Sequence, residues 1–449
     1  MKHIIIGGDA AGMTAAMQIK RLEPKANLVV FEKGMDTSYG ACGIPYFFGG
    51  EVESIEKLVV VSPEDFREKR GLDVRTRAEV LSIDPQAKTI TVQTEKGKED
   101  HPYDRLLIAT GSSPIMPAWP KSGLKNIFGL RNLADARRLA GALSGSIKRI
   151  GIVGAGYVGL ETAEAFAKKG FDVTVIEKNA MPLSGTDKTI GQKIVDELKS
   201  HNVRLLLGAT VSAFDGNERV KKIITDQGDI DVDLAIVSLG VKPNSDLAKN
   251  AGIELGPAGS IKVDEAMKTS APNIFAAGDC AQSIHGVTGQ AVYIPLALPA
   301  NRMGRVAGAN MTGASEKMPP VIGSAVTRVF DLTIAFTGLT SSQAKRLNWN
   351  HACFGKEVGS TAHYMKSAKK VFAQIIIDPE TGKILGAEMA GRDNTVGSRI
   401  NTVATAISSG MNIWDFANLD LAYAPPFNPV WDPWLQVVNR ATLEMKPDL

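Results

Sequence analysis

Two stretches of this chain share one pattern: an apolar strand, a glycine-rich turn, a helix, and a second strand that ends on glutamate. The first begins "HIIIGGDAAGM" and ends at Glu32, and the second begins "IGIVGAGYVGLE" and ends at Glu177. In such a βαβ unit the glycines permit a tight turn and close approach to a pyrophosphate, and the helix N-terminus supplies amide donors. Two units whose first glycines, Gly7 and Gly154, stand 147 positions apart predict two dinucleotide sites in an α/β protein.

Length and composition narrow the class of protein. At 449 residues the chain is too long for one ordinary core. Its net charge of +3 gives no reason to expect a nucleic-acid surface. Three cysteines make no disulfide framework and suit a reducing cytoplasm. We find no run of about 18 apolar residues and no signal peptide, so we expect no membrane partner.

The remaining segments predict where the chain changes architecture. Strands that run into glycine turns continue through "LLIATGSSP", "AIVSLG" and "IFAAGDCA". After residue 323, "SAVTRVFDLTIAFTGLT" and "VFAQIIIDPETGKILGAEMAG" read instead as antiparallel strands, the second joined by a "DPETGK" hairpin turn. The prediction is two Rossmann-like, three-layer nucleotide-binding domains followed by a C-terminal α+β domain.

The two glycine motifs differ in one position. Gly154, Gly156 and Gly159 complete the G-x-G-x-x-G pattern, whereas Asp9 replaces the middle glycine of the first motif and has no evident role there. Glu177 stands where a carboxylate favours the ribose hydroxyl of NADH, but the adjacent Lys178 favours the phosphate of NADPH, so both nucleotides remain open.

Longer strings carry a family resemblance. "SYGACGIPYFFGG", "IPLALPANRMGRVAGAN" and "DLAYAPPFNPVWDP" resemble the FAD-dependent pyridine nucleotide–disulfide reductases, in the single-cysteine branch of coenzyme A-disulfide reductases, NADH oxidases and persulfide reductases. The resemblance implies an FAD domain over 1–114 and 243–323, an NAD(P)H domain over 115–242, and a dimerisation domain over 324–449 that forms a homodimer. It implies that Glu32 holds the FAD ribose and that Asp279 faces the ribityl–pyrophosphate part.

The same resemblance, together with the motifs, gives the full set of expected cofactor contacts. They are Gly7, Gly8, Ala11, Gly12, Glu32, Lys33, Thr110, Gly111, Gly154, Gly156, Tyr157, Val158, Gly159, Glu161, Glu177, Lys178, Gly240, Gly278, Asp279, Pro295 and Ala297.

Cys42 is the predicted redox residue. Two-cysteine relatives place the second cysteine five positions later, where this chain has Phe47, and Cys280 and Cys353 are remote in sequence. Cys42 must therefore take its partner from outside, as a mixed disulfide with a thiol or as a sulfenic acid formed with oxygen. We expect Cys280 and Cys353 to pack as small apolar residues.

Three substrates remain open: coenzyme A disulfide, a persulfide or polysulfide, and oxygen. The first helix, "GDAAGMTAAM", lacks the histidine that the oxidase members carry, which favours a thiol substrate. The alternative to an enzyme is a binding protein that senses redox state or NADH, in which the flavin is a sensor and not a catalyst. The resemblance implies that Tyr364 and Tyr423 reach across the dimer to the partner's Cys42 and have catalytic roles there. Expected substrate contacts are Gln18, Arg21, Ser38, Tyr39, Lys69, Arg70 and Asn301, and no metal is expected.

Overall fold

The computed structural model describes residues 1–143 and 145–445, and the chain forms two compact units. Unit 1 comprises Met1–Met116, Gly129–Leu143 and Gly240–Val321, and unit 2 comprises Pro117–Phe128, Ser144–Leu239 and Ile322–Leu449. Residue 144 of the predicted NAD(P)H domain and residues 446–449 of the predicted dimerisation domain lie outside the described part. The three predicted domain ranges stay a prediction.

Unit 1 is built on a parallel sheet of order β18-β7-β1-β2-β3. The strands are β1 (Lys2–Ile6), β2 (Asn27–Phe31), β3 (Asp73–Arg75), β7 (Arg105–Ile108) and β18 (Ile274–Ala276). Residues 4–6 of β1 and 106–108 of β7 are buried apolar residues, as expected for strands covered on both faces. Helix α1 (Ala10–Leu22) connects β1 to β2, so the first glycine turn lies at the carboxyl edge of the sheet.

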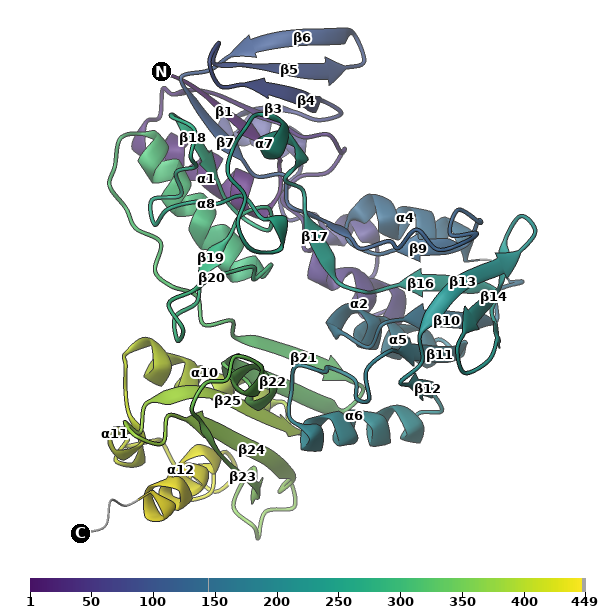
Figure 1. Cartoon of the computed structure of the whole chain (residues 1–449), viewed down its shortest axis with the longest axis vertical. Coiled ribbons are helices and arrows are strands. Elements are labelled where there is room, and N and C mark those ends of the chain that lie inside the picture. Colours follow the sequence, from purple (N-terminus) through teal and green to yellow (C-terminus); the bar gives the residue numbers. More distant parts are fainter. Residues whose placement is uncertain (144, 446–449) are drawn as a thin grey trace. The chain divides into compact units, whose positions relative to one another are not determined.

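Helix α8 (Ala297–Met311) packs directly against α1 (Figure 1). A Cβ atom added at Gly304 would lie 2.2 Å from the carbonyl oxygen of Ala11, and one at Gly308 would lie 2.6 Å from that of Ala15. The two backbones approach this closely because both positions lack a side chain. The helix that starts at the glycine turn is thereby held firmly in place.

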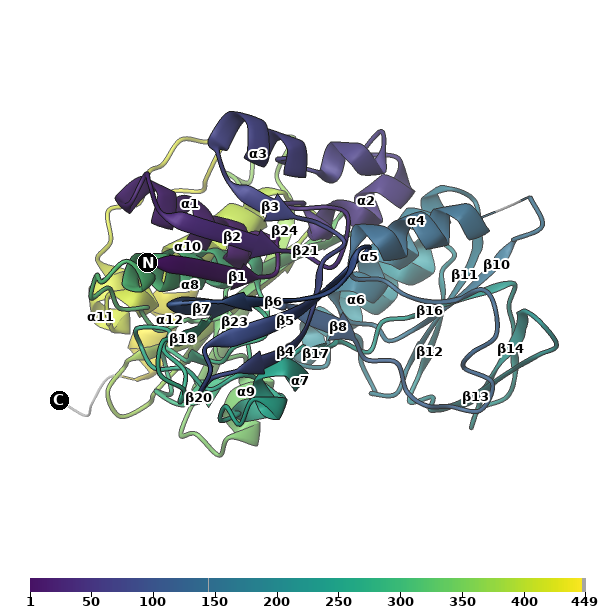
Figure 2. The same cartoon turned by 90° about the horizontal axis from the view of Figure 1, so that it is seen from above.

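The remaining elements of unit 1 are short. Three antiparallel strands, β4 (Glu79–Asp84), β5 (Thr89–Thr94) and β6 (Gly97–Pro102), form a separate sheet (Figure 2). The helices are α2 (Ile44–Gly49), α3 (Pro63–Arg70), α4 (Leu133–Ala142) and α7 (Asp246–Asn250), and the short paired strands are β8 (Ser112–Pro114) with β17 (Val241–Pro243) and β19 (Ser283–Ile284) with β20 (Ala291–Val292).

Unit 2 contains a second sheet, of order β12-β11-β10-β16-β9. Its strands are β9 (Ile127–Gly129), β10 (Arg149–Val153), β11 (Asp172–Glu177), β12 (Arg204–Leu207) and β16 (Leu234–Val237), of which β10, β11, β12 and β16 run parallel. Helix α5 (Tyr157–Lys168) follows the second glycine turn, and α6 (Lys188–Ser200) follows β11. An antiparallel sheet of β13 (Val211–Gly216), β14 (Val220–Thr225) and β15 (Ile230–Asp231) adjoins it.

The C-terminal part of unit 2 is an antiparallel sheet of order β21-β22-β25-β24-β23. Its strands are β21 (Ala325–Val329), β22 (Leu332–Gly338), β23 (Ala352–Gly359), β24 (Lys370–Ile377) and β25 (Ile384–Gly391), and its helices are α9 (Ser341–Arg346), α10 (Thr395–Ser408), α11 (Ile413–Ala417) and α12 (Pro433–Glu444). All eight residues of β25 are buried, so this central strand is covered on both faces.

The predicted fold class is confirmed: two parallel sheets each carry a glycine turn, and an α+β region follows. Among the described helices, none combines the length and the apolar character needed to cross a membrane.

Candidate functional site

The first glycine turn is shaped by backbone contacts that exclude side chains. Gly7 has a φ of +108°, and a Cβ atom there would lie 2.1 Å from the carbonyl oxygen of Ala109. The carboxylate of Glu32, at the end of β2, accepts the N–H of Gly8 at 2.7 Å and that of Gly34 at 2.6 Å. The acid predicted to hold a ribose is therefore fixed at the edge of the turn.

The second glycine turn repeats this construction. Gly154 has a φ of +106°, and its Cβ atom would lie 2.3 Å from the carbonyl oxygen of Ser238. Glu177 accepts the N–H of Ala155 at 2.8 Å and that of Asn179 at 2.9 Å. The side chain of Lys178 is exposed. Both predicted ribose acids thus hold the same backbone positions of their turns.

The start of α5 fits a phosphate group. No side chain caps this helix, so its first N–H groups lack the usual acceptor. A Cβ atom added at Gly156 would meet nothing within 4 Å, which leaves room for a ligand to reach the backbone.

Tyr157 stacks on Phe336 with ring centroids 5.9 Å apart, and Glu161 accepts the hydroxyl of Thr327 at 2.9 Å. Gly159 lies against the backbone of Gly154, and Val158 is exposed.

Asp9 occupies the matching position at the start of α1, directly before the helix. Its side chain does not cap the helix, and its Oδ1 atom accepts the N–H of Tyr39 at 3.1 Å. Burial raises the pKa of Asp9 to about 6. Asp9, which had no role in the sequence analysis, connects the first glycine turn to the loop that carries Cys42.

Arg131 is a residue that sequence reasoning missed. Its Nη2 atom lies 2.6 Å from the Oδ2 atom of Asp279, and its Nε–H donates to the Ser112 hydroxyl at 3.1 Å. Its charge also interacts with Asp9 and Tyr39. The signal in the sequence is slight: one arginine in "GLRNLAD", directly before the residue that caps α4.

The other predicted cofactor residues in unit 1 lie at strand ends and helix starts. The hydroxyl of Thr110 donates to the Asn244 carbonyl at 2.6 Å. Gly111, Gly240 and Gly278 all have positive φ. The remaining positions are Ala11 and Gly12 in α1, exposed Lys33 after β2, Pro295 before α8, and Ala297 as its first residue.

Cys42 lies in a single 3₁₀ turn, Ala41–Gly43, that leads directly into α2. Its side chain is exposed, and it is a thiol in the structure, as are Cys280 and Cys353. A Cβ atom added at Gly43 would lie 2.3 Å from Leu58 Cδ2. The loop is thus seated closely on neighbouring residues while the sulfur remains accessible.

The predicted substrate residues gather in part along α1. Arg21 Nη1 lies 3.4 Å from Gln18 Oε1, as expected from their i, i+3 spacing. The hydroxyl of Thr14 donates to Asn301 Oδ1 at 2.7 Å, which brings α8 to the same helix.

Of the two basic residues predicted on α3, one lies beside α1. Arg70 contacts the Met17 sulfur at 4.0 Å and lies over the Phe66 ring. Lys69 instead forms an exposed ion pair with Asp65 at 2.6 Å, within its own helix.

The two predicted catalytic tyrosines meet in unit 2. Tyr364 and Tyr423 are 63% and 46% exposed, and a side-chain hydrogen bond with Tyr364 raises the pKa of Tyr423. The N–H of Ala362 donates to the Pro425 carbonyl at 3.2 Å, which joins the two loops.

The guanidinium of Arg399, almost fully buried, fixes these loops from α10. It donates to the carbonyls of Ser360 at 2.8 Å and Phe427 at 2.9 Å, and it pairs with the Asp432 carboxylate at 2.7 Å. One cation therefore holds the chain on both sides of the tyrosine pair.

The other two cysteines differ from each other. Cys280 is buried, with its sulfur 3.4 Å from the Ile108 carbonyl, so the prediction of simple packing is confirmed. For Cys353 the prediction is wrong, because its side chain is exposed on the edge strand β23. Partial burial, together with the charges of Glu388 and Asp187, raises the pKa of the Cys353 thiol to about 11.

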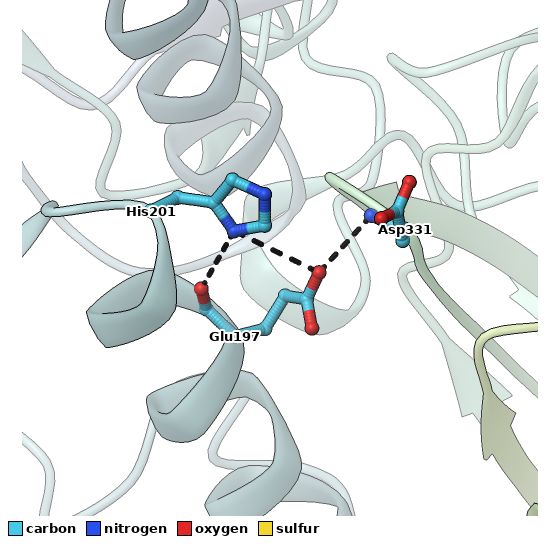
Figure 3. A group of neighbouring side chains, drawn as sticks. All are labelled: Glu197, His201 and Asp331. Carbon is cyan, nitrogen blue, oxygen red and sulfur yellow. Dashed lines mark hydrogen bonds and ion pairs between the residues drawn. The ribbon is translucent and has the colours of Figure 1, made fainter.

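One group of metal-type ligands occurs in the described ranges, at Glu197, His201 and Asp331 (Figure 3). The Glu197 carboxylate already receives the Arg392 guanidinium at 2.7 Å and the Asp331 N–H at 3.1 Å. We interpret the group as a structural contact between α6 and the turn that joins β21 to β22.

Comparison with known proteins agrees with this geometry. The profile of the pyridine nucleotide-disulphide oxidoreductases matches residues 1–308, and that of their dimerisation domain matches residues 324–433. The chain is 38% identical over 434 residues to the NAD(P)H coenzyme A polysulfide/persulfide reductase of Pyrococcus horikoshii, covering 96% of each protein.

Two solved structures are similar over nearly the whole chain. Reduced CoADR-RHD of Bacillus anthracis has a TM-score of 0.96 and 33% identity, covering 99% of this chain and 80% of that one. The water-forming NADH oxidase of Lactobacillus brevis, bound to NADH, has a TM-score of 0.95 and 33% identity, covering 99% of both chains.

Proposed function

This chain belongs to the pyridine nucleotide-disulphide oxidoreductase family, and we propose that it uses NAD(P)H to reduce coenzyme A disulfide or a related persulfide or polysulfide. The predicted resemblance to this family is confirmed. The observation that carries the proposal is the exposed thiol of Cys42 in a loop fixed to the first glycine turn. The printed name of the Pyrococcus horikoshii relative supports the choice of substrate.

The two glycine turns hold the two cofactors in this proposal. Glu32 and the start of α1 bind FAD, and Glu177 and the start of α5 bind the nicotinamide nucleotide. FAD, when bound, supplies the transfer of two electrons from NAD(P)H to a sulfur–sulfur bond. Arg131, which faces Asp279 and Asp9, provides positive charge at the first site.

Cys42 carries the substrate sulfur. Its thiolate attacks a disulfide R–S–S–R, the bond between the two substrate sulfurs breaks, and one thiolate RS⁻ leaves. Two electrons then reduce the Cys42–S–S–R mixed disulfide, which releases the second RS⁻ and restores the Cys42 thiolate. Phe47 stands where two-cysteine relatives carry the second cysteine, so no thiol five positions after Cys42 is present to displace the substrate.

The residues along α1 supply contacts for an anionic substrate. Arg21 and Gln18 share one face of the helix, and Arg70 of α3 lies beside Met17 of the same helix. Cations in this position suit the phosphates of coenzyme A. We assign Asn301, Ser38 and Tyr39 to the same substrate region. Tyr364 and Tyr423 are assigned to stabilisation of the thiolate that leaves at the partner's Cys42.

A second candidate function is NADH oxidation by oxygen through a Cys42 sulfenic acid. It is supported by the similarity to the Lactobacillus brevis NADH oxidase. The described helix α1 contains no histidine that could assist oxygen chemistry, and His3 is fully buried in β1. We therefore place this function second.

The dimerisation domain that matches residues 324–433 supports a homodimer as the working form. We propose the cytoplasm as its location, because three thiols without a disulfide suit a reducing compartment.

Mass spectrometry of the native protein, denatured without reductant, tests this proposal. We expect a coenzyme A adduct on Cys42. In Cys42→Ser, NADH should still reduce the bound FAD while disulfide turnover falls at least 100-fold. Cys353→Ser is the matched control and should turn over normally. Undiminished disulfide turnover in Cys42→Ser contradicts the mechanism, and a sulfenic acid on Cys42 with rapid oxygen uptake supports the oxidase instead.

A further inference from the structure

Asp9 and Gly156 hold the same place in two otherwise matching turns. Each residue directly precedes the helix of its glycine motif, with extended backbone angles and no side-chain cap on the helix. At Gly156 the space that a side chain would occupy is open. At Asp9 the space is filled by a carboxylate that does not cap the helix and that accepts the N–H of Tyr39.

The loop that Asp9 contacts is held by three successive backbone amides. The N–H of Ser38 donates to the Gly8 carbonyl at 3.0 Å, that of Tyr39 to Asp9 Oδ1 at 3.1 Å, and that of Gly40 to the Leu58 carbonyl at 2.8 Å. Cys42 follows two residues later.

The backbone of this loop requires such support. Ser38 has a φ of +46°, a left-handed conformation that costs a non-glycine residue roughly 1–2 kcal/mol. Neighbouring contacts must hold the residue in this state. Two of the three amide contacts come from the first glycine turn, and the central one depends on the side chain of residue 9.

A carboxylate beside a phosphate-binding turn is tolerable here because Arg131 faces it. Arg131 interacts electrostatically with Asp9 and Tyr39 and pairs directly with Asp279. The negative charge of Glu32 acts in the opposite sense and raises the pKa of Asp9. The negative charge of Asp9 is thus partly offset within unit 1, and its Oδ1 atom remains available as an acceptor.

We propose that Asp9 is a positioning residue for Cys42: its carboxyl oxygen holds the Tyr39 amide and so connects the first glycine turn to the cysteine loop. The inference rests on the proposed function, in which Cys42 receives the substrate sulfur. A glycine at position 9 would complete the G-x-G-x-x-G motif but would remove the acceptor.

Two variants separate the acceptor from the charge. Asp9→Gly removes the acceptor, whereas Asp9→Asn keeps an oxygen in the same place and removes only the charge. The direct readout is amide hydrogen exchange of the peptide covering residues 37–43, measured with FAD bound. We expect its exchange to be at least fivefold faster in Asp9→Gly and within twofold of wild type in Asp9→Asn.

Kinetic measurements test separately the reduction of FAD by NADH and the reduction of the disulfide. In Asp9→Gly the rate of FAD reduction by NADH should stay within twofold, and kcat with the disulfide should fall about tenfold, the size of one net hydrogen bond. Asp9→Asn should be normal in both. FAD content per chain is measured for each variant.

Three results would overturn the inference. They are unchanged hydrogen exchange in Asp9→Gly, equal impairment of Asp9→Asn and Asp9→Gly, and recovery of turnover in Asp9→Gly on adding excess FAD. The exchange measurement involves no turnover, so failure of the proposed function, seen as undiminished activity in Cys42→Ser, is distinguishable from failure of the role of Asp9.

Discussion

Tyr423 and Tyr364 come from separate loops, yet they share a hydrogen bond at an exposed surface of unit 2. Such a pair is unusual for exposed side chains, because water competes with the contact. The guanidinium of Arg399 holds both loops by donating hydrogen bonds to the carbonyls of Ser360 and Phe427. The arrangement gives each phenol a defined position without burying it, as the proposed role toward a diffusing substrate requires.

Replacing Tyr423 by phenylalanine removes only the hydroxyl. We expect disulfide turnover to fall about tenfold or more, because a donor to the leaving thiolate is lost, while FAD content and FAD reduction by NADH stay unchanged. Stopped-flow and steady-state kinetics separate these rates. Tyr103→Phe, which removes a buried hydroxyl in unit 1, is the matched control. An unchanged turnover rate in Tyr423→Phe would leave that residue with a packing role.

At the scale of single residues, the sequence predicts what depends on local spacing. The predicted ribose acids Glu32 and Glu177 follow from their distance to the glycines, and both lie at their turns. The contact of Asp9 with Tyr39 spans 30 positions, and Arg131 meets Asp279 across 148. Periodicity carries no information about such distant contacts, so the contact made by Asp9 and the position of Arg131 could not be predicted from the sequence.

Among the elements, α1 and α8 form a closely packed pair in unit 1. Gly304 and Gly308 lie one helical turn apart on α8 and face the backbone of Ala11 and Ala15. Because α1 starts at the first glycine turn, any change in its distance from α8 moves the residues that hold FAD in the proposed function.

Gly304→Ala tests this contact. Its Cβ atom would lie 2.2 Å from the Ala11 oxygen, so the helices must separate, and we expect unfolding of the protein with FAD bound to become easier by about 1–3 kcal/mol. Gly141→Ala is the matched control. Gly141 lies within α4 and has open space around it, so alanine at this position should stabilise the folded protein by about 0.5–1 kcal/mol. Thermal unfolding measures both. Equal melting temperatures for the two variants would contradict the packing argument.

The type and order of the elements could be predicted because, in both βαβ units, the spacing of apolar residues and the position of the glycine turn indicate the same elements. The exposed position of Cys353 could not. The run "NHACFG" indicates a strand but not its place in a sheet, and β23 lies at the edge. Edge position is decided by pairing between distant strands, which no local pattern encodes.

At the scale of the whole molecule, a buried acid in unit 2 contributes to how stability changes with pH. Glu388 is fully buried in β25 and accepts the N–H groups of Asp187 and Ser341 at 2.9 and 3.3 Å. Burial raises the pKa of this carboxyl from 4.5 to about 7. Between those pH values the folded protein binds a proton that the unfolded chain has lost, so this group makes stability fall as the pH rises.

Glu388→Gln cannot ionise and should therefore escape this loss. We expect the stability of the variant relative to wild type to rise by about 2–3 kcal/mol between pH 5 and pH 8. Urea unfolding with saturating FAD at pH 5, 6.5 and 8 measures the difference. Glu380→Gln, at an exposed turn of the same sheet, should show no such trend. A stability difference that does not change with pH would contradict the assignment.

Within unit 2, the helices α5 and α6 form hydrogen bonds and ion pairs with the C-terminal sheet region. Glu164 receives the Phe330 N–H, Glu197 receives Arg392, and Lys193 pairs with Glu357. A chimera that takes its last 120 or so residues from a relative would inherit only one side of each pair. A graft of this region should therefore begin before α5, so that α5 and α6 come from the same protein as the sheet that they contact.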